Sequence, residues 1–388
     1  MQRLGTMIRQ LARHRSQWEG LMKAAAANAA SSGHSRPISD RLTETRDFGA
    51  NPGNLRMLSY APPELTPSPG LVVVLHGCTQ TAAGYDHGSG WSTLAERYGF
   101  VVLFPEQQEA NNPKRCFNWF QTGDTERDRG EVASIRQMVE RAIRDHGIDR
   151  KRVFVTGLSA GGAMTAALLA TYPDVFAGGA IIAGLPYRSA ASVPEAFEAM
   201  FQGQEKPAEA WGNLVRNASH HRGPWPKVSI WHGSADATVK PMNAGEIVKQ
   251  WTNVHGVSVH PSRSEIVDGY PRRVWTNESG EDVIEEYVIT GMAHGTPLAT
   301  GNGENHYGAA GPFLLEVGIS SSYHAAKFMG LTAHAVSKKA SVSPKAVSIQ
   351  PVPPPQQKAS PRAKPSATLG PDIGDVITKA LKAAGLMR

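Results

Sequence analysis

Short, mostly apolar runs alternate along this chain with longer segments in which apolar residues recur every three or four positions. Val132 to Ile143 place their apolar residues on one face of a helix ending near Gly147, and a second helix, rich in alanine and leucine, is expected over 160–170. Strands that alternate with helices predict an α/β fold, with a mainly parallel central sheet covered by helices on both faces. The apolar runs that predict buried strands are 71–75, 101–104, 152–156, 180–183 and 228–231.

The two flanks of the chain depart from this pattern. Residues 1–46 are expected to form a helical N-terminal extension, and residues 47–336 the α/β domain. Residues 337–370 are rich in proline, serine and lysine, which is typical of a disordered linker. Residues 371–388 regain helical spacing and predict a short amphipathic helix on that linker.

Charge is unevenly distributed along the chain. The formal net charge is +6, but residues 337–370 contain six basic residues and no acidic one. The first 48 residues are also net basic, so the segment between the flanks is net acidic. A domain that binds DNA or RNA needs a basic face, and we therefore expect no nucleic-acid partner.

Several other classes of protein are disfavoured by simple sequence features. No run of 18 or more apolar residues exists, so no transmembrane segment is expected. Arginines interrupt the apolar residues near the N-terminus, and a Sec signal peptide is not predicted. Two cysteines, Cys78 and Cys116, are too few for a disulfide scaffold or a cysteine-based zinc site. We expect no metal and no cofactor.

A candidate nucleophile lies where a predicted strand meets a predicted helix. Ser159 is the centre of a Gly-X-Ser-X-Gly motif over 157–161. Flanking glycines allow the sharp turn that exposes a serine hydroxyl at the end of a strand. The motif alone is common by chance, but its position between strand and helix indicates a nucleophilic serine.

A serine nucleophile needs a base and an acid, which in this architecture follow it in the order acid, then histidine. Asp236 follows the predicted strand 228–231, and His294 lies between glycines after a strand-like segment. We predict the triad Ser159, Asp236 and His294. His232 precedes the proposed acid and is expected to shape the turn. Two carboxylates precede the serine and are weaker candidates: Asp124 and Asp128.

The developing oxyanion needs hydrogen-bond donors, which this architecture takes from backbone amides. One is the amide after the nucleophile, that of Ala160. The second is expected from the loop after the strand 71–75, at Cys78. His76 in this loop either contributes to substrate binding or has a structural role in the loop.

Taken together, these residues resemble the esterase family named for poly(3-hydroxybutyrate) depolymerases, which also includes feruloyl and acetylxylan esterases. The resemblance spans about 47–330 and implies an α/β-hydrolase fold and the same triad. The N-terminus lacks a clear leader, although members of the family are often secreted. The tail is too small for a folded binding domain, so the resemblance implies ester hydrolysis without implying attack on solid polymer. It rests on six blocks in order: 75–80, 116–120, 156–164, 183–187, 231–236 and 291–295.

The resemblance also implies that Cys78 and Cys116 lie near each other at the site. A disulfide between them and two free thiols are both open. Trp119 and Phe120 are candidates for an apolar wall beside the substrate or for the core, and Trp231 joins them as a candidate substrate-binding residue.

The first hypothesis for function is therefore a cofactor-free serine carboxylic ester hydrolase acting through an acyl-enzyme. Hydroxyalkanoate oligomers or polymer and short-chain esters are its expected substrates, with feruloyl or acetyl esters of polysaccharides as the alternative. An alcohol in place of water would make the same triad an acyltransferase. A hypothesis of another class is a non-catalytic protein that binds a granule or surface. In either case the basic linker and terminal helix are candidates for a tether.

Overall fold

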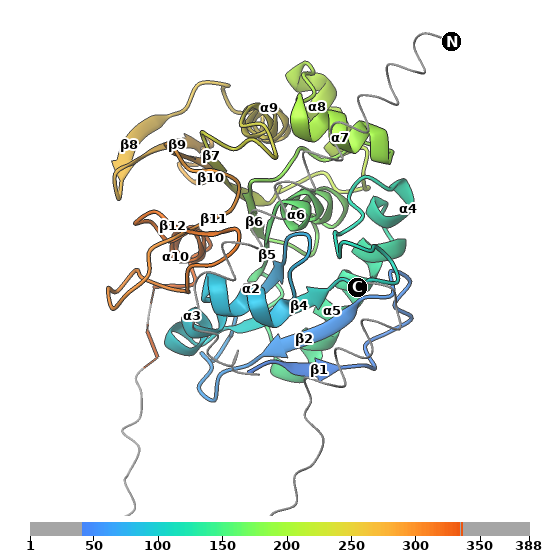
Figure 1. Cartoon of the computed structure of the whole chain (residues 1–388), viewed down its shortest axis with the longest axis vertical. Coiled ribbons are helices and arrows are strands. Elements are labelled where there is room, and N and C mark those ends of the chain that lie inside the picture. The colour runs from blue at the N-terminus through green and yellow to red at the C-terminus, as the bar shows by residue number, and fades with distance from the viewer. Residues whose placement is uncertain (1–40, 334, 337–388) are drawn as a thin grey trace, which may run out of the picture. The chain divides into compact units, whose positions relative to one another are not determined.

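In the computed structural model, which describes residues 41–333 and 335–336, a ten-stranded sheet forms the centre of the protein (Figure 1). Its six central strands, from β4 to β10, are mutually parallel, whereas the strands at both edges pair antiparallel. The expected mainly parallel sheet is therefore confirmed. The strands lie in the order β1 (Thr43–Thr45), β2 (Arg56–Tyr60), β4 (Val101–Glu106), β3 (Leu71–Leu75), β5 (Val153–Leu158), β6 (Gly178–Ile182), β7 (Lys227–Gly233), β10 (Asp282–Ile289), β9 (Tyr270–Thr276) and β8 (Arg263–Val267).

Side chains of the central strands alternate between two hydrophobic cores, one on each face of the sheet. In β3, Leu71, Val73 and Leu75 belong to one core, and Val72 and Val74 belong to the other. Because both faces of β3 are buried in apolar cores, apolar and polar residues do not alternate along its sequence.

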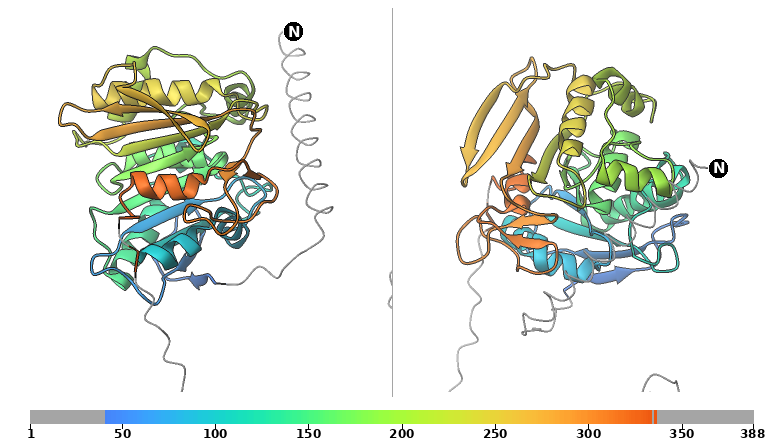
Figure 2. Two further views of the ribbon diagram at one scale, coloured as in Figure 1. Left: turned by 90° about the vertical axis from the view of Figure 1, so that its left-hand side faces the viewer. Right: turned by 45° about the horizontal axis from the view of Figure 1, so that its top comes forward.

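Helices cover both faces of the sheet (Figure 2). Side chains of α5, α6 and α9 fill the core that contains Leu75, and those of α2, α3 and α10 fill the other. The helices are α2 (Ala82–Ser89), α3 (Trp91–Tyr98), α4 (Thr122–Thr125), α5 (Gly130–His146), α6 (Ala160–Thr171), α7 (Val193–Phe201), α8 (Ala208–Arg216), α9 (Met242–His255) and α10 (Ser321–Phe328).

The helix expected to end near Gly147 is α5, and its end has a simple local cause. Gly147 adopts the left-handed conformation with φ of 63°, and its N–H donates to the carbonyl of Ile143. This conformation is easy for glycine and ends a helix by satisfying one of its last carbonyl groups.

Two additional segments interrupt the alternation of central strands and helices. Helices α7 and α8 lie between β6 and β7, and a long segment after β10 includes a small parallel pair, β11 (Thr296–Leu298) and β12 (Leu314–Glu316). Both segments follow the carboxyl ends of parallel strands. They therefore enlarge the edge of the sheet where sites form in α/β proteins.

The expected extension and tail fall mostly outside the described residues, including the helix within 1–46, the linker 337–370 and the helix 371–388. Strand β1 pairs with β2 although it lies ahead of residue 47. The central sheet therefore extends ahead of residue 47. Among the described helices, none has the length and apolar character needed to cross a membrane.

Candidate active site

The predicted site residues come from loops at the carboxyl ends of the parallel strands. Ser159 follows β5, Asp236 follows β7 and His294 follows β10. Cys78 belongs to the loop after the neighbouring strand β3. Parallel strands place all these loops at one edge of the sheet, which brings residues that are far apart in sequence into one site.

Ser159 occupies a strained turn between β5 and α6. Its φ of 58° and ψ of −114° lie in a region that residues other than glycine rarely adopt. The backbone on either side is closely packed: a Cβ added to Gly157 would lie 2.4 Å from the carbonyl oxygen of Gly161. A Cβ added to Gly161 would lie 2.4 Å from the carbonyl oxygen of Leu75. Glycine is therefore required on both sides of the turn.

The side chains of Ser159, His294 and Asp236 form one continuous chain of hydrogen bonds. His294 Nε2 lies 2.9 Å from Ser159 Oγ, and His294 Nδ1 lies 2.7 Å from Asp236 Oδ2. An ionised carboxylate only accepts hydrogen bonds, so Nδ1 carries the proton and Nε2 is left to accept the serine proton. This arrangement is suited to activating a hydroxyl for nucleophilic attack.

Asp236 is buried but well satisfied. Its Oδ1 accepts hydrogen bonds from the amides of Thr238, at 2.8 Å, and Val239, at 2.9 Å. Burial alone would raise the pKa of Asp236, but the adjacent His294 and the hydrogen bonds from His232 and His294 hold it well below its usual range. The carboxyl therefore stays ionised at neutral pH and fixes the orientation of the His294 ring.

His232 supports this carboxylate rather than the serine. Its Nε2 lies 2.8 Å from the carbonyl oxygen of Val239 and 3.3 Å from Asp236 Oδ2. The expectation that His232 shapes the turn around the acid agrees with these contacts.

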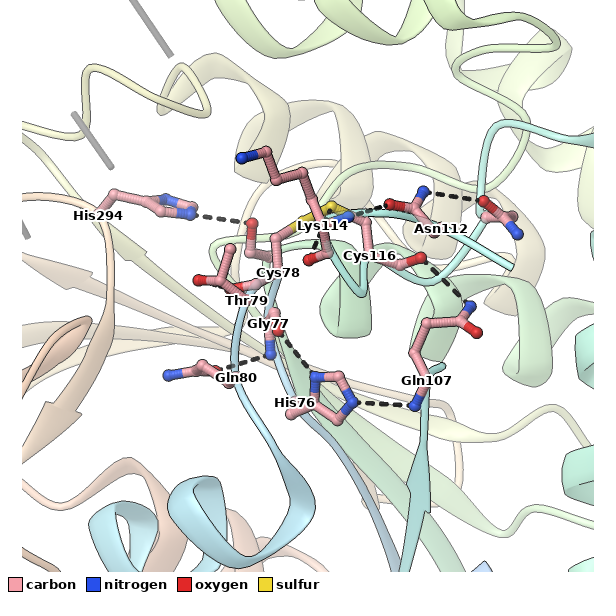
Figure 3. The surroundings of a disulfide bond; sticks show 12 residues. His76, Gly77, Cys78, Thr79, Gln80, Gln107, Asn112, Lys114, Cys116 and His294 are labelled. Atoms are coloured by element: carbon pink, nitrogen blue, oxygen red, sulfur yellow. Dashed lines mark hydrogen bonds between the residues drawn. A yellow bond between two sulfur atoms is a disulfide. The ribbon is translucent and has the colours of Figure 1, made fainter. Parts of the chain in front are cut away.

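The two predicted oxyanion donors come from different segments: Ala160 directly follows the nucleophile, and Cys78 lies in the loop after β3. Ala160 is the first residue of α6, and the N–H groups in the first turn of a helix have no acceptor within the helix. The α6 N-terminus also places the positive end of a helix dipole near Ser159. The Cys78 loop is anchored on each side, because the Gly77 amide donates to Gln80 Oε1 and the Thr79 amide to the Lys114 carbonyl (Figure 3).

Cys78 and Cys116 are joined by a disulfide (Figure 3). Of the two alternatives left open by the sequence, the structure therefore contains the bridge. It ties the loop after β3 to the loop after β4, across a sequence separation of 38 residues. Both cysteines line the cavity beside Ser159.

A cavity of about 210 Å³ opens beside Ser159. Trp119 and Phe120 form part of its wall, and Trp119 also belongs to the hydrophobic core against which Phe120 packs, so both of their expected roles are present. Helix α7 forms another part and was not foreseen, although its apolar residues at positions 193, 196, 197 and 200 have helical spacing that could have revealed it. The cavity is lined by Cys78, Asn112, Lys114, Cys116, Trp119, Phe120, Ser159, Ala160, Leu185, Val193, Ala196, Phe197, Met200 and Val239.

Two residues expected to bind substrate instead lie in the protein interior. Trp231 is fully buried in the core, where its ring stacks on Tyr287 at 3.7 Å and its Nε1 donates to Ser229 Oγ. His76 is also buried, and both of its ring nitrogens are engaged by backbone groups of Gly77 and Gln107. The structure thus corrects the expectation for Trp231, and of the two roles left open for His76 it favours the structural one.

No group of three or more His, Cys, Asp or Glu side chains within residues 41–333 and 335–336 is arranged to hold a metal ion. The hydrogen-bonded chain at Ser159 contains a hydroxyl, an imidazole and a carboxylate, the groups that ester hydrolysis by a serine triad uses.

Comparison with known proteins identifies one family. Residues 57–263 match the family model described as Esterase PHB depolymerase, a span that includes Ser159 and Asp236. Poly(3-hydroxyalkanoate) depolymerase C of Paucimonas lemoignei is 50% identical over 291 residues, which cover 75% of this chain and 70% of that protein.

Acetylxylan esterases form a second group of relatives. The acetylxylan esterase of Coprinopsis cinerea is 35% identical over 264 residues, covering 66% of this chain and 70% of that protein. The solved structure of an acetyl xylan esterase from Aspergillus awamori superimposes with a TM-score of 0.60 at 31% identity. That match covers 65% of this chain and 93% of the other.

The close packing at Gly161 can be tested by substitution. In Gly161→Ala the new Cβ would collide with the carbonyl oxygens of Leu75 and His76, which are backbone atoms at the end of β3. We expect α6 to be displaced from the Cys78 loop and kcat on p-nitrophenyl butyrate to fall on the order of 100-fold.

Gly245→Ala is the matched control, because Gly245 lies inside α9 and an added Cβ there meets nothing within 4 Å. This variant should keep full activity and gain about 0.5–1 kcal/mol in free energy of unfolding, measured by urea denaturation. Equal activity of the two variants would show that the packing at Gly161 does not matter for the site.

Proposed function

Because the chain belongs to the PHB depolymerase esterase family, we propose that this carboxylic ester hydrolase acts on hydroxyalkanoate esters with Ser159, His294 and Asp236 as its catalytic triad. The observation that carries the proposal is the unbroken hydrogen-bonded chain from Asp236 through His294 to Ser159 Oγ, beside an apolar cavity.

In the acylation half of the reaction, Ser159 Oγ attacks the ester carbonyl carbon while His294 Nε2 accepts the hydroxyl proton. The tetrahedral intermediate then collapses, the ester C–O bond breaks, and His294 gives its proton to the leaving alcohol. The product of this half is an acyl group esterified to Ser159. Asp236 stabilises the His294 imidazolium that exists between the two proton transfers.

Deacylation repeats the sequence with water as the nucleophile. His294 removes a proton from the water as its oxygen attacks the acyl carbon, and then returns the proton to Ser159 Oγ. The products are a carboxylic acid and free enzyme. In both halves the negative charge on the carbonyl oxygen is stabilised by the amides of Ala160 and Cys78.

The cavity favours a substrate with a bulky, mostly apolar acyl part. Its walls are formed by the aromatic rings of Trp119, Phe120 and Phe197 and by aliphatic residues of α7. A hydroxyalkanoate unit would bury its alkyl side chain there, whereas an acetyl group is too small to contact most of these residues. The 50% identity to a poly(3-hydroxyalkanoate) depolymerase supports the same class.

Lys114 adds a polar feature to this cavity. It is the one charged residue among those that line the cavity in the described part of the chain. Soluble hydroxyalkanoate oligomers end in a free carboxylate, which an ammonium group near the mouth would attract. Acetyl and feruloyl esters of polysaccharides remain the second candidate class, supported by the acetylxylan esterase relatives.

Removal of the nucleophile tests the triad. Ser159→Ala should lower kcat on p-nitrophenyl butyrate by roughly 10⁴- to 10⁶-fold, because the other residues cannot replace the attacking oxygen. A fluorophosphonate probe should label the wild-type protein and not the variant. Ser322→Ala, at another buried serine in α10, serves as the control and should keep wild-type activity.

Substantial hydrolysis by Ser159→Ala would rule out the assignment. Failure of the probe to label the wild-type protein would favour a non-catalytic binding protein instead.

A panel of esters tests the substrate class. The value of kcat/KM should be higher for a 3-hydroxybutyrate trimer than for acetylated or feruloylated oligosaccharides. Lys114→Ala should lower it roughly two- to fivefold for the trimer with a free carboxylate, as expected of an exposed charge pair, and leave it unchanged for the trimer methyl ester. A preference for the sugar esters would favour the second class.

The basic tail is proposed as a tether for the active domain. Residues 337–370 contain six basic residues and no acid, so they would be attracted to an anionic surface. Deletion of 337–388 should weaken sedimentation with native polyhydroxyalkanoate granules, most clearly at low salt, without changing kcat on p-nitrophenyl butyrate. Equal sedimentation of the full-length and shortened proteins would exclude the tether.

A further inference from the structure

Glu131 is a buried carboxyl group that takes no part in the proposed reaction, and hydrogen bonds connect it to the loop after β3 that contains Cys78. Glu131, in the first turn of α5, is only 1% exposed. Its Oε2 accepts from the amide of Asn118 at 2.9 Å, and its Oε1 accepts from Asn118 Nδ2 at 2.8 Å and from Gln107 Nε2 at 2.5 Å. Burial and the nearby Asp124 raise the pKa of Glu131 to about 8, against the effect of these three hydrogen bonds. A buried carboxyl is costly to keep, which raises the question of what it holds in place.

One connection from Glu131 leads to the backbone of Cys78. The residue bonded to Glu131, Gln107, donates its backbone N–H to His76 Nε2 at 3.1 Å. Nε2 is therefore the accepting nitrogen, and the proton of a neutral His76 lies on Nδ1. Nδ1 in turn donates to the carbonyl oxygen of Gly77 at 2.7 Å (Figure 3).

This last contact fixes the direction of the proposed oxyanion donor. The Gly77 carbonyl and the Cys78 N–H belong to the same peptide unit. Among the peptide bonds of residues 41–333 and 335–336, Gly223–Pro224 alone is cis, so the Gly77–Cys78 unit is trans. In a planar trans peptide the C=O and N–H point in opposite directions, and holding one sets the other. A hydrogen bond to the carbonyl also polarises the peptide and strengthens its N–H as a donor.

A second connection leads to the side chain of Cys78. Gln107 Nε2, which donates to Glu131, also lies 3.2 Å from the carbonyl oxygen of Cys116. Cys116 is bonded through the disulfide to Cys78, and Asn118 follows it by two residues. Glu131 is therefore connected to Cys78 by two routes, one through the backbone of the β3 loop and one through the disulfide.

We propose that Glu131 is a positioning residue for catalysis, which aligns the Cys78 amide with the reacting carbonyl oxygen by holding Gln107, and through it His76 and Cys116. The inference rests on the proposed function, because it concerns the oxyanion donors of the same reaction. Glu131 never touches the substrate; its effect is transmitted through groups that are fixed by hydrogen bonds and by the disulfide.

The side-chain chemistry explains why glutamate is needed at this position. All three groups that face the carboxyl are N–H donors, and the ionised form of Glu131, which predominates above its pKa of about 8, offers two accepting oxygens to them. Glutamine has nearly the same shape but replaces one oxygen with an NH₂ group. Its NH₂ would face either the amide of Asn118 or the side chains of Gln107 and Asn118, and neither arrangement satisfies all donors.

The test is Glu131→Gln, measured above pH 8, where the wild-type carboxyl is mostly ionised, with p-nitrophenyl butyrate and with butylboronic acid. Boronic acids add to the serine and form a tetrahedral adduct, which places an oxygen at the oxyanion position. Loss of an oxyanion donor costs about 10²–10³ in kcat, and a misaligned donor keeps part of its effect. We therefore expect kcat to fall roughly 10- to 100-fold with KM changed by less than about threefold, and the inhibition constant of the boronic acid to rise by the same factor as kcat falls.

Glu285→Gln is the matched control. Glu285 is another buried carboxyl, in β10, where it accepts from Ser229 Oγ and is paired with Arg272. This substitution should lower the unfolding temperature without changing kcat or the boronic acid affinity. Gln107→Leu is the second variant of the network: it keeps Glu131 but breaks the links from Glu131 to Gln107 and from Gln107 to Cys116. It should show the kinetic pattern of Glu131→Gln and decides the test if that variant does not fold.

The positioning role is overturned if a folded network variant keeps the kcat and boronic acid affinity of the Glu285→Gln control. It is also overturned if kcat falls but the boronic acid affinity stays at the wild-type value, since alignment of the donor affects both. If the wild-type protein itself neither hydrolyses the ester nor binds the boronic acid, the proposed function has failed instead.

Discussion

The site depends on the close contact between the start of α6 and the end of β3. The backbone of Gly161 lies so near the carbonyl oxygens of Leu75 and His76 that no side chain fits between them. This contact joins the start of α6, which contains Ala160, to the end of β3, which leads into the loop of Cys78. Ser159 adopts its strained conformation directly before the same helix, so this packing affects the nucleophile as well as both segments that carry the proposed oxyanion donors.

The surroundings of two buried carboxyl groups near this edge of the sheet shift their pKa values in opposite directions. Asp236 is adjacent to His294 and His232, which hold its pKa down in spite of burial. Glu131 has only neutral donors around it and Asp124 nearby, and its pKa is raised. The contrast fits the roles proposed for them: in the proposed mechanism Asp236 balances the charge that forms on His294, whereas Glu131 holds neighbouring groups in place.

The sequence predicted the parts of the molecule that have strong local signals. The strand 71–75 was found because it is apolar throughout, and Ser159, Asp236 and His294 were found because each follows a strand in the expected order. Strands β8 and β9 were missed because they lie at the sheet edge, where mixed polar residues remove the apolar pattern. Burial is set by tertiary packing, so the position of Trp231 beside a motif led to the wrong expectation that it binds substrate.

Glu131 was overlooked for a related reason. A glutamate in an amphipathic helix is usually on its solvent face. Its spacing from Ile135 and Met138, at four and seven residues, nevertheless places it on the apolar side of α5. A charged residue within an apolar stripe was the available signal, but its partners Gln107 and Asn118 come from other loops and could not be identified from the sequence.

The disulfide has a practical consequence for anyone who prepares this enzyme. The Cys78–Cys116 bond crosses between two active-site loops, so its formation completes the site as well as the fold. A bacterial cytoplasm keeps thiols reduced, and protein recovered from it would contain molecules with the loops unlinked. Total protein would then overstate the concentration of competent enzyme. Turnover numbers should therefore be referred to titrated active sites and to the measured content of free thiol.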